Sequence, residues 1–290
     1  MVCSEMRKQA LRAGLQMEFT DDKGDYATRM KKFADGEYEM VMMPINSYLQ
    51  HGQAHKYPGV IVMAIAESRG ADGIVCRAGK LIKGKKGITA NDLNDPALRF
   101  VYTGESPSEF LMDQAISGFG LDNLKSTDVW RIKVAGSSEV YQKAKDGQGD
   151  VFILWEPDLS KALALPGMQY VYGSDKISHC IVDVLIVRRE FIASHLASVS
   201  SLLRTYFKVM ASYATDKERL IKEMSLSTNL PTDVVAGTLK KIDWFGLREN
   251  CAGQFGIGDT ASEGVINTIW TCTDTPSSTA QFWKGFQDQA

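Results

Sequence analysis

The residues best placed to contact a ligand follow a short apolar run near the middle of the chain. Residues 151–154 (VFIL) are apolar at every position, as in a strand that helices cover on both faces. Trp155, Glu156 and Pro157 come directly after this run, so an aromatic ring and a carboxylate stand at the carboxyl end of the predicted strand. Because open α/β sheets bind ligands outside the carboxyl ends of their strands, Trp155 and Glu156 are candidate ligand contacts.

A second group of candidate residues lies between a predicted strand at 98–102 and a predicted helix at 110–118. Ser106 has the side chain of a helix N-cap, Pro107 suits the first helical position, and Glu109 stands where a capping box has its acid. The free N–H groups and the positive end of such a helix attract anions. These residues either contact a ligand or only cap the helix, and no GxxxxGK[ST] phosphate loop accompanies them.

Nucleophilic and metal chemistry find little support in the residue types and their spacing. No GxSxG, HExxH or Cys–His motif occurs. His51 and His55 are four residues apart on a predicted helix, but no third, acidic ligand stands near them. The five cysteines show no CxxC spacing, and either Cys251 and Cys272 form a disulfide or all five remain reduced. We therefore expect no enzyme activity, no metal and no cofactor.

The composition is that of a soluble globular protein and limits its partners. The 290 residues suffice for about two domains, each with a buried core. Hydrophobic residues make up 44% and charged residues 23%, and the net charge of −2 favours neither a nucleic acid nor a membrane surface as partner. No apolar run approaches the ~20 residues needed to cross a bilayer. The first residues predict an amphipathic helix rather than a signal peptide, so either the chain is cytoplasmic or its true start has been removed.

A repeated pattern indicates how the chain positions the candidate residues. Residues 26–49 and 139–163 each predict a helix, an Asp-Gly turn, a buried strand and a polar exit that contains proline. Asp35 and Asp146, which open the two turns, are 111 residues apart. Similarity at that distance predicts two lobes of one design rather than a solenoid of short repeats.

Predicted strands dominate the first two-thirds of the chain, and predicted helices dominate the last third. We predict strands at residues 16–19, 40–43, 59–66, 73–77, 98–102, 129–134, 151–154, 168–172 and within 178–188. We predict helices at residues 5–15, 25–33, 45–50, 110–118, 139–145, 192–213, 216–224, 232–241, 262–269 and 280–286. Asn46 or Ser47 is expected to cap the helix at 45–50, and the lysine-rich segment 78–94 is expected to be a solvated turn.

The order of four motifs resembles a known family. Along the chain come GADGIV from Gly70, GESPSEFL from Gly104, DGQGDV from Asp146 with Trp155-Glu156-Pro157, and IVDVL from Ile181. This series resembles the solute-binding proteins of nitrate/sulfonate/taurine-type ABC importers, and it is also similar to their thiamin-precursor-binding relatives. The resemblance extends over nearly all of the chain, to about Gly256.

The resemblance implies the type II periplasmic-binding fold, an α/β fold of two lobes. Each lobe would be a mixed sheet flanked by helices, with the ligand cleft between the lobes. Residues 73–77 and 183–188 would be crossover strands, residues 1–76 and 184–290 lobe 1, and residues 77–183 lobe 2. The repeat agrees, because one copy falls in each lobe. The candidate ligand-binding residues are Ser47, Tyr48, Ser68, Arg69, Ser106, Ser108, Glu109, Trp155, Glu156 and Asp183.

The same resemblance implies a monomeric binding protein without catalysis, which delivers a small molecule to the membrane permease of an ABC importer. It would be periplasmic or lipid-anchored outside the cytoplasm. The chain departs from the family in lacking a signal peptide and a first strand with its loop, so lobe 1 would lack a central strand. Glu109 also adds a carboxylate where relatives often have a neutral or basic residue. An enzyme of the thiamin-precursor type and a solute-sensing regulatory module are the alternatives.

The charges of the candidate residues bear on the ligand. Arg69 is the one cation among them, whereas Glu109, Glu156 and Asp183 are carboxylates. A bare inorganic anion requires a positive field, because desolvating an uncompensated ion costs several kcal/mol. A carboxylate beside an aromatic face suits an ammonium group, and a helix start can hold an anionic head. The residues therefore favour a small zwitterion or an amine-bearing organic solute, with taurine-like sulfonates as one example.

Overall fold

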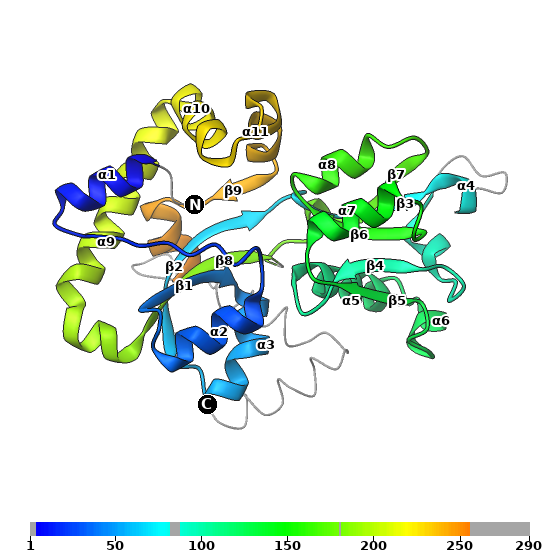
Figure 1. Ribbon diagram of the computed structural model, residues 1–290, viewed down its shortest axis with the longest axis horizontal. Helices are drawn as coiled ribbons and strands as arrows, with labels where there is room; N and C mark the ends of the chain where they lie inside the picture. Colours follow the sequence, from blue (N-terminus) through cyan, green and yellow to red (C-terminus); the bar gives the residue numbers. More distant parts are fainter. Residues whose placement is uncertain (1–3, 82–87, 180, 256–290) are drawn as a thin grey trace.

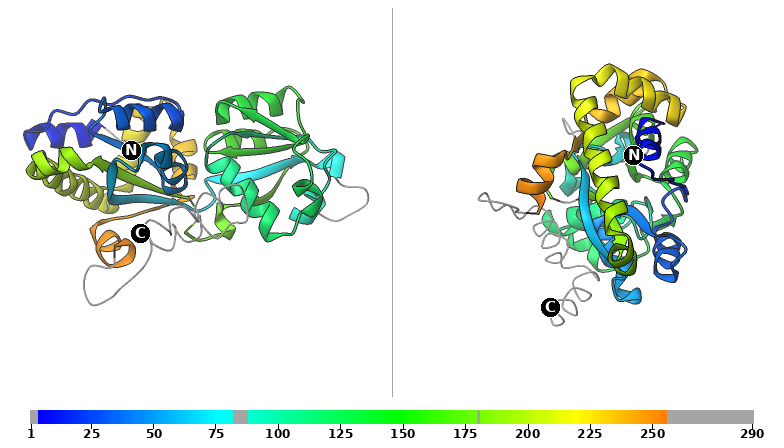
Figure 2. Two further views of the ribbon diagram at one scale, coloured as in Figure 1. Left: turned by 90° about the horizontal axis from the view of Figure 1, so that it is seen from below. Right: turned by 90° about the vertical axis from the view of Figure 1, so that its left-hand side faces the viewer.

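Two β-sheets lie side by side in the computed structural model, which describes residues 4–81, 88–179 and 181–255 (Figure 1). Sheet A has the strand order β1–β8–β2–β9, with β1 (Met40–Pro44), β8 (Val182–Arg188), β2 (Gly59–Ser68) and β9 (Ile242–Trp244). Sheet B has the order β5–β4–β6–β3–β7, with β5 (Arg131–Val134), β4 (Phe100–Thr103), β6 (Val151–Trp155), β3 (Asp72–Arg77) and β7 (Met168–Gly173). We call the parts built on sheets A and B the first lobe and the second lobe, and Figure 2 shows both from two further directions.

Sheet A is buried on both faces, because successive side chains of a strand point to opposite sides. On β8, Val184 and Ile186 share a core with Phe33 of α2, whereas Leu185 and Val187 share another core with residues of α9. The ladders of this sheet are antiparallel within the described residues, whereas the resemblance implies a mixed sheet. The helices of this lobe are α1 (Ser4–Arg12), α2 (Tyr26–Asp35), α3 (Ile45–Gly52), α9 (Arg189–Thr215), α10 (Lys217–Thr228) and α11 (Thr232–Leu239), with η1 (Gln53–His55) and η4 (Glu249–Gln254).

Sheet B is mixed and has the predicted buried strand at its centre. β4 pairs in parallel with β5 and β6, and β3 pairs antiparallel with β6 and β7. On β6, Ile153 shares a core with Leu111 of α5, whereas Phe152 and Leu154 share another core with Leu159 of α8. The helices of this lobe are α4 (Ala78–Leu81), α5 (Pro107–Gly118), α6 (Asp122–Lys125), α7 (Ser137–Lys145) and α8 (Asp158–Leu163), with η2 (Ala90–Leu93) and η3 (Ser174–Lys176).

The chain passes between the lobes twice, once at residues 69–71 and once between β7 and β8. The expected crossover strands at 73–77 and 183–188 are wrong in this respect, because each lies within one sheet. β3 pairs with β6 from Asp72 to Cys76, and β8 pairs with β1 and β2 over its length. Complete ladders and burial on both faces hold each strand in its own sheet. The crossing therefore falls on the segments before the strands, and the exact residues that divide the lobes remain a proposal.

The repeated pattern has the predicted structure in both lobes. α2 ends at Gly36, which has the left-handed φ of 84°, and β1 follows. α7 ends just before Gly147, which has a φ of 74°, and β6 follows. One copy lies in each sheet, so the prediction of two similar lobes from the Asp-Gly turns is confirmed.

Other local predictions are wrong or lie outside the described residues. Residues 16–19 form no strand, because none of the described strands pairs with them. Neither Asn46 nor Ser47 caps α3, whose N-cap is Pro44, and both side chains are buried instead. No described helix combines the length and apolar character that a membrane crossing requires. The predicted helices at 262–269 and 280–286 and the predicted pairing of Cys251 with Cys272 involve residues outside the described ranges.

Candidate ligand-binding pocket

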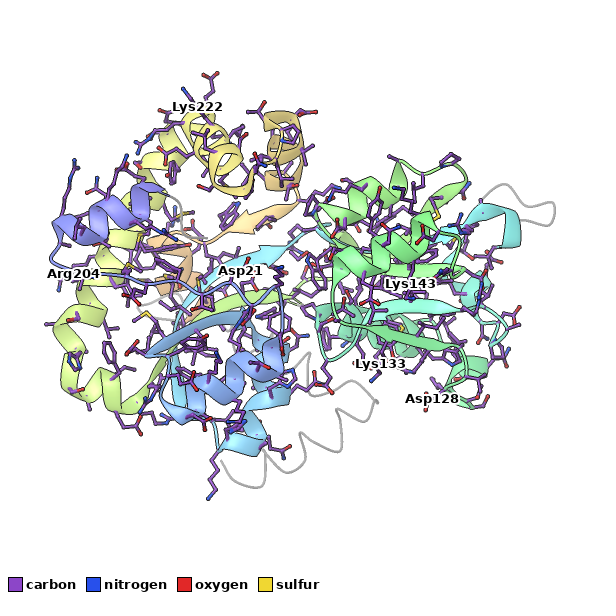
Figure 3. The ribbon with its side chains drawn as sticks, in the orientation of Figure 1. Asp21, Asp128, Lys133, Lys143, Arg204 and Lys222 are labelled. Atoms are coloured by element: carbon purple, nitrogen blue, oxygen red, sulfur yellow. The ribbon has the colours of Figure 1, made fainter. Side chains whose placement is uncertain are left out.

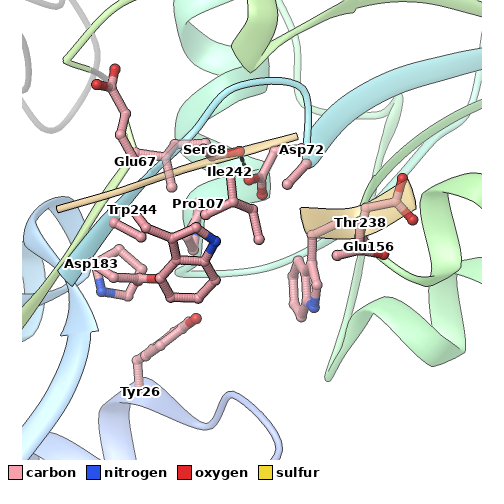
Figure 4. Close-up of a pocket in the computed structure, with 15 residues that line it drawn as sticks. Tyr26, Glu67, Ser68, Asp72, Pro107, Glu156, Asp183, Thr238, Ile242 and Trp244 are labelled. Atoms are coloured by element: carbon pink, nitrogen blue, oxygen red, sulfur yellow. Dashed lines mark hydrogen bonds between the residues drawn. The ribbon is translucent and has the colours of Figure 1, made fainter. Parts of the chain in front are cut away.

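A pocket of about 200 Å³ lies between the two lobes (Figure 4). The first lobe contributes Tyr26, Asp183 and Trp244 to its lining, and the second lobe contributes Asp72 and Trp155. Neither lobe alone surrounds this space, so the pocket depends on how the lobes are held together.

Strand ends position the side chains around the pocket. Trp155 is the last residue of β6, and its partner in the antiparallel ladder is Asp72, the first residue of β3. Asp183 lies near the start of β8, opposite Ala66 of β2 and Pro44 of β1. The two aspartates thus belong to different sheets, and each follows one of the segments that join the lobes.

Three aromatic side chains form apolar walls of the pocket. Trp155, Trp244 and Tyr26 are each partly buried. Figure 4 shows the Tyr26 side chain pointing toward the indole of Trp244. The indole Nε1–H of Trp244 has no acceptor among the described residues. Flat aromatic faces with few polar groups are typical of small-molecule sites.

Two of the four carboxylates that line the pocket are neutralised by basic residues. Glu156 forms an ion pair with Lys241 of the first lobe and accepts a 2.7 Å hydrogen bond from the Ser160 hydroxyl. Glu67 lies 3.6 Å from the Arg69 guanidinium, and it also accepts a backbone N–H. No lysine, arginine or histidine belongs to the described pocket lining itself.

The other two carboxylates, Asp72 and Asp183, form no ion pair in the described part of the chain, although the charge of Arg29 acts on Asp183. Asp72 is buried and accepts a 2.6 Å hydrogen bond from Ser68. The pKa of Asp72 is raised to about 7, mainly by burial, while the Ser68 hydrogen bond lowers it and the charges of Asp183 and Glu156 contribute to the rise. Asp183 is open to solvent within the pocket, while atoms of both lobes surround it. Although its side chain keeps contact with solvent, the surrounding atoms desolvate the carboxyl group and raise the pKa of Asp183, and the charge of Arg29 opposes the effect.

Ser174 ties the two connections between the lobes to Asp72. Its hydroxyl lies 2.7 Å from that of Ser68 and accepts hydrogen bonds of 2.8 and 3.3 Å from the backbone N–H groups of Gly70 and Asp72. Ser68 ends β2 and Ser174 follows β7, so this cluster joins the outgoing and returning segments. A change at Asp72 therefore acts directly on the hinge.

The sequence-predicted site residues divide into two groups. Those at the pocket are Ser68, Trp155, Glu156 and Asp183. Those away from its lining are Ser47, Tyr48, Arg69, Ser106, Ser108 and Glu109. This division gives their positions, and ligand contact by any of them remains a proposal.

The residues away from the pocket have structural contacts of their own. Ser106 caps α5, accepting a 3.2 Å hydrogen bond from the Ser108 N–H. Glu109 accepts a 2.7 Å hydrogen bond from the backbone N–H of Glu105 and pairs with Lys133 at 3.0 Å. Tyr48 donates 3.0 Å to a backbone carbonyl, and Arg69 pairs with Asp243 at 3.1 Å. The hydroxyls of Ser47 and Ser108 are fully buried, and neither has a partner in the described part of the chain.

Sequence reasoning missed Tyr26, Asp72 and Trp244 as pocket residues. Asp72 belongs to the GADGIV motif, but its contact with the pocket depends on where the chain crosses between lobes. Tyr26 begins α2, the helix of the first repeat copy. Its place at the start of that helix was the one feature of the sequence that could have marked it as a pocket residue. Trp244 ends β9, a three-residue strand too short to show a period of two.

Several charged residues outside the pocket lie on the outer surface of the two lobes, whereas Asp150 and Asp158 are buried. Asp128, Arg204 and Lys222 are exposed, and Figure 3 shows them away from the space between the sheets. This arrangement is ordinary for a soluble fold, because isolated charges are costly to bury. Asp150 and Asp158 have Arg99 and Lys161 as ion-pair partners, whereas Asp72 and Asp183 at the pocket form no ion pair among the described residues.

Solved structures show what this chain is similar to. No protein-family model matches it, and no curated protein matches its sequence. The periplasmic aliphatic sulphonate-binding protein of Escherichia coli matches with a TM-score of 0.69 at 15% identity, over 97% of this chain and 83% of that one. The alkanesulfonate-binding protein of Xanthomonas axonopodis pv. citri bound to MOPS matches with 0.64 at 15%, over 84% and 80%. The ligand-binding component of an ABC-type import system of Staphylococcus aureus matches with 0.65 at 14%, over 91% and 84%.

These neighbours are binding proteins, and at 14–15% identity their likeness to this chain establishes the fold. The two sheets, the helices that flank them and the pocket between the lobes belong to the same architecture. The predicted fold class is confirmed: the chain has the two-lobed α/β fold of periplasmic solute-binding proteins.

Proposed function

We propose that this chain binds a small organic solute between its lobes and delivers it to the membrane permease of an ABC importer. The observation that carries the proposal is the pocket, which both lobes line. Ligand sites are typically concave, mostly apolar and located where domains meet. The neighbouring structures, whose names describe sulfonate binding and ABC import, support the same role for this chain.

Two contacts between the lobes supply the closure that this role requires. Lys241 of the first lobe pairs with Glu156 of the second. His51 Nε2 lies 3.2 Å from the backbone oxygen of Glu105, again across the two lobes. Both contacts exist only when the lobes are closed. A solute that touches both lobes likewise binds the closed form more tightly, so it shifts the equilibrium toward closure. We place the protein outside the cytoplasm, in the periplasm or on a lipid anchor, where it acts as a monomer.

The solute that suits this pocket is sulfonate- or amine-bearing and about the size of taurine. Pro107, the first residue of α5, lines the pocket, so the positive end of this helix stands beside the site. A sulfonate group carries the negative charge that the positive end of a helix attracts. The aspartates and aromatic walls suit an amine. Both halves of a taurine-like molecule thus have suitable surroundings.

An enzyme of the thiamin-precursor type is the weaker candidate. Its chemistry requires a nucleophile or an acid–base pair directed at the bound molecule. The described lining contains no histidine and no cysteine. A solute-sensing module uses the same pocket and closure, and it differs only in the partner that receives the closed form.

A thermal-shift screen of the full chain, freed of bound solute, tests the binding role. The panel contains amino-sulfonates, betaines, pyrimidines, nitrate and bicarbonate. An organic solute at about 100 times its Kd is expected to raise the melting temperature by about 5–10 °C, because it binds only the folded form. Trp155→Ala should abolish this rise, since Trp155 is a wall of the pocket.

Phe119→Ala is the matched control, because Phe119 is an aromatic residue of the second lobe outside the pocket lining. This variant should retain the full ligand-induced rise. Stabilisation by nitrate or bicarbonate alone would contradict the organic-solute assignment, and a panel without any stabilising compound would contradict the binding role.

A further inference from the structure

The pocket has more negative charge than its surroundings balance. Glu156 and Glu67 have Lys241 and Arg69 as ion-pair partners, whereas Asp72 and Asp183 form no ion pair among the described residues. Arg29 forms its ion pair with Asp22, and its charge acts on Asp183 without such a pair. Two carboxylates at one partly enclosed site repel each other, and each charge is costly to desolvate alone. The site therefore has a deficit of positive charge that a bound molecule can supply.

The two carboxylates belong to different lobes and face the same space between them. Asp183 is on β8 of sheet A, and Asp72 is on β3 of sheet B. Repulsion between them opposes closure, whereas a cation between them attracts both sheets. The two indoles and the Tyr26 ring, which line the same pocket, add faces that attract a cation.

We propose that, if the chain binds a solute as argued above, the group held between Asp72 and Asp183 is a positively charged nitrogen, either an ammonium or a protonated heterocycle. The two aspartates are its counter-charges, and Trp155, Trp244 and Tyr26 are its apolar surroundings. A solute without such a group leaves both carboxylates uncompensated when the lobes close. The cation is thus the part of the solute that the pocket selects.

Ionisation of Asp72 links this binding to pH. Burial raises the pKa of Asp72 to about 7, so a substantial fraction of this carboxyl is protonated at neutral pH without ligand. A cation favours the ionised form, and binding therefore releases a proton. Affinity is expected to fall as the pH drops from 8 to 5.5. Burial raises the pKa of Asp183 as well, which acts in the same direction.

Tyr26 and Arg29, whose ionisation the charge of Asp183 affects, do not supply this pH dependence. Burial raises the pKa of Tyr26 far above neutrality. Although burial opposes it, the hydrogen bond and charge of Asp22 raise the pKa of Arg29, so Arg29 stays charged.

Two matched pairs of compounds isolate the charge of the ligand. Choline and 3,3-dimethyl-1-butanol have the same shape, but only choline has a positive nitrogen. Taurine and ethanesulfonate share a sulfonate, but only taurine has an ammonium. Calorimetric titration of the full chain at pH 8 is expected to give at least a tenfold lower Kd for the charged-nitrogen member of a pair. A preference below tenfold in both pairs, including absence of binding, overturns the proposal.

Substitution and pH then assign the effect to the aspartates. Asp183→Asn is expected to raise the Kd of the preferred compound at least tenfold, whereas Asp233→Asn, on the exposed surface of α11, should leave it unchanged. The charge of choline does not titrate, so a fall in its affinity at pH 5.5 belongs to the protein. An unchanged Kd in Asp183→Asn, with its fold verified by melting, contradicts the assignment.

The outcomes separate this proposal from the binding role itself. If ethanesulfonate binds as tightly as taurine, the chain is a solute-binding protein and only the charge assignment fails. If no compound of the wider thermal-shift panel binds, the binding role fails as well.

Discussion

Replacing Asp72 by asparagine is expected to stabilise the ligand-free chain at pH 8. Burial raises the pKa of Asp72 from 3.8 to about 7, so ionising it in the folded chain costs more than in the unfolded chain. Between these two values the folded chain binds more protons, and its stability falls as pH rises. Above pH 7 the full cost of up to about 4 kcal/mol is present, at 1.36 kcal/mol for each pH unit. Asparagine removes this cost and can still accept the Ser68 hydrogen bond.

Urea denaturation of both chains at pH 8 and pH 4 measures the effect. The variant should be more stable at pH 8, and the difference should be small at pH 4, which lies close to the unfolded pKa of 3.8, so that ionising Asp72 in the unfolded chain gains little. Asp233→Asn serves as the control and should change stability by less than about 0.5 kcal/mol, as exposed substitutions usually do. A variant less stable than the parent at pH 8 would show that Asp72 has a compensating partner in the folded chain.

Replacing Lys241 by methionine is expected to open the lobes of the ligand-free chain. The Glu156 side chain is only 2% exposed, and Lys241 reaches it from the other lobe. Without this partner, closure leaves a buried carboxylate with the Ser160 hydroxyl and no cation. Opening returns Glu156 to water. The free energy lost with the ion pair therefore changes the equilibrium between open and closed forms rather than the free energy of unfolding. We expect a shift of about 1–3 kcal/mol toward the open form, in the range of hydrogen bonds to charged groups.

Small-angle X-ray scattering detects this opening as an increase in the radius of gyration. Lys240→Met is the matched control, because Lys240 is exposed and stands one residue away. It should scatter like the parent chain. Identical scattering of Lys241→Met and the parent would mean that the ion pair does not hold the lobes together.

Local signals predicted several elements and the two-lobed repeat, whereas the fold class was implied by the resemblance of four ordered motifs to a family. The Asp-Gly turns at Gly36 and Gly147 end helices and precede buried strands, as their residue types require. The Ser106–Pro107 start of α5 follows from capping chemistry alone. The point where the chain crosses between the lobes before β3 could not be predicted. A short apolar run such as β3 does not reveal which sheet it will join.

The pocket could be predicted only in part, because it depends on contacts between distant segments. Trp155 was predicted from its position at the end of a strand, and Asp183 from the IVDVL motif of the resemblance; both line the pocket. Trp244 reaches the pocket through pairing of β9 with β2, which no local pattern indicates. Ser108 was a reasonable candidate by type, but packing buries it completely. Side-chain polarity alone does not distinguish a residue that faces a ligand from one that closes a helix end.

A crystal structure of the full chain, grown with the compound that raises its melting temperature most, tests the central claim most directly. The account predicts this compound between the indoles of Trp155 and Trp244, in contact with residues of both lobes. Its positive nitrogen should lie within about 4–6 Å of the Asp72 and Asp183 carboxylates, the range over which opposite charges act strongly. A compound bound elsewhere on the chain, with only solvent between the two indoles, would contradict the account.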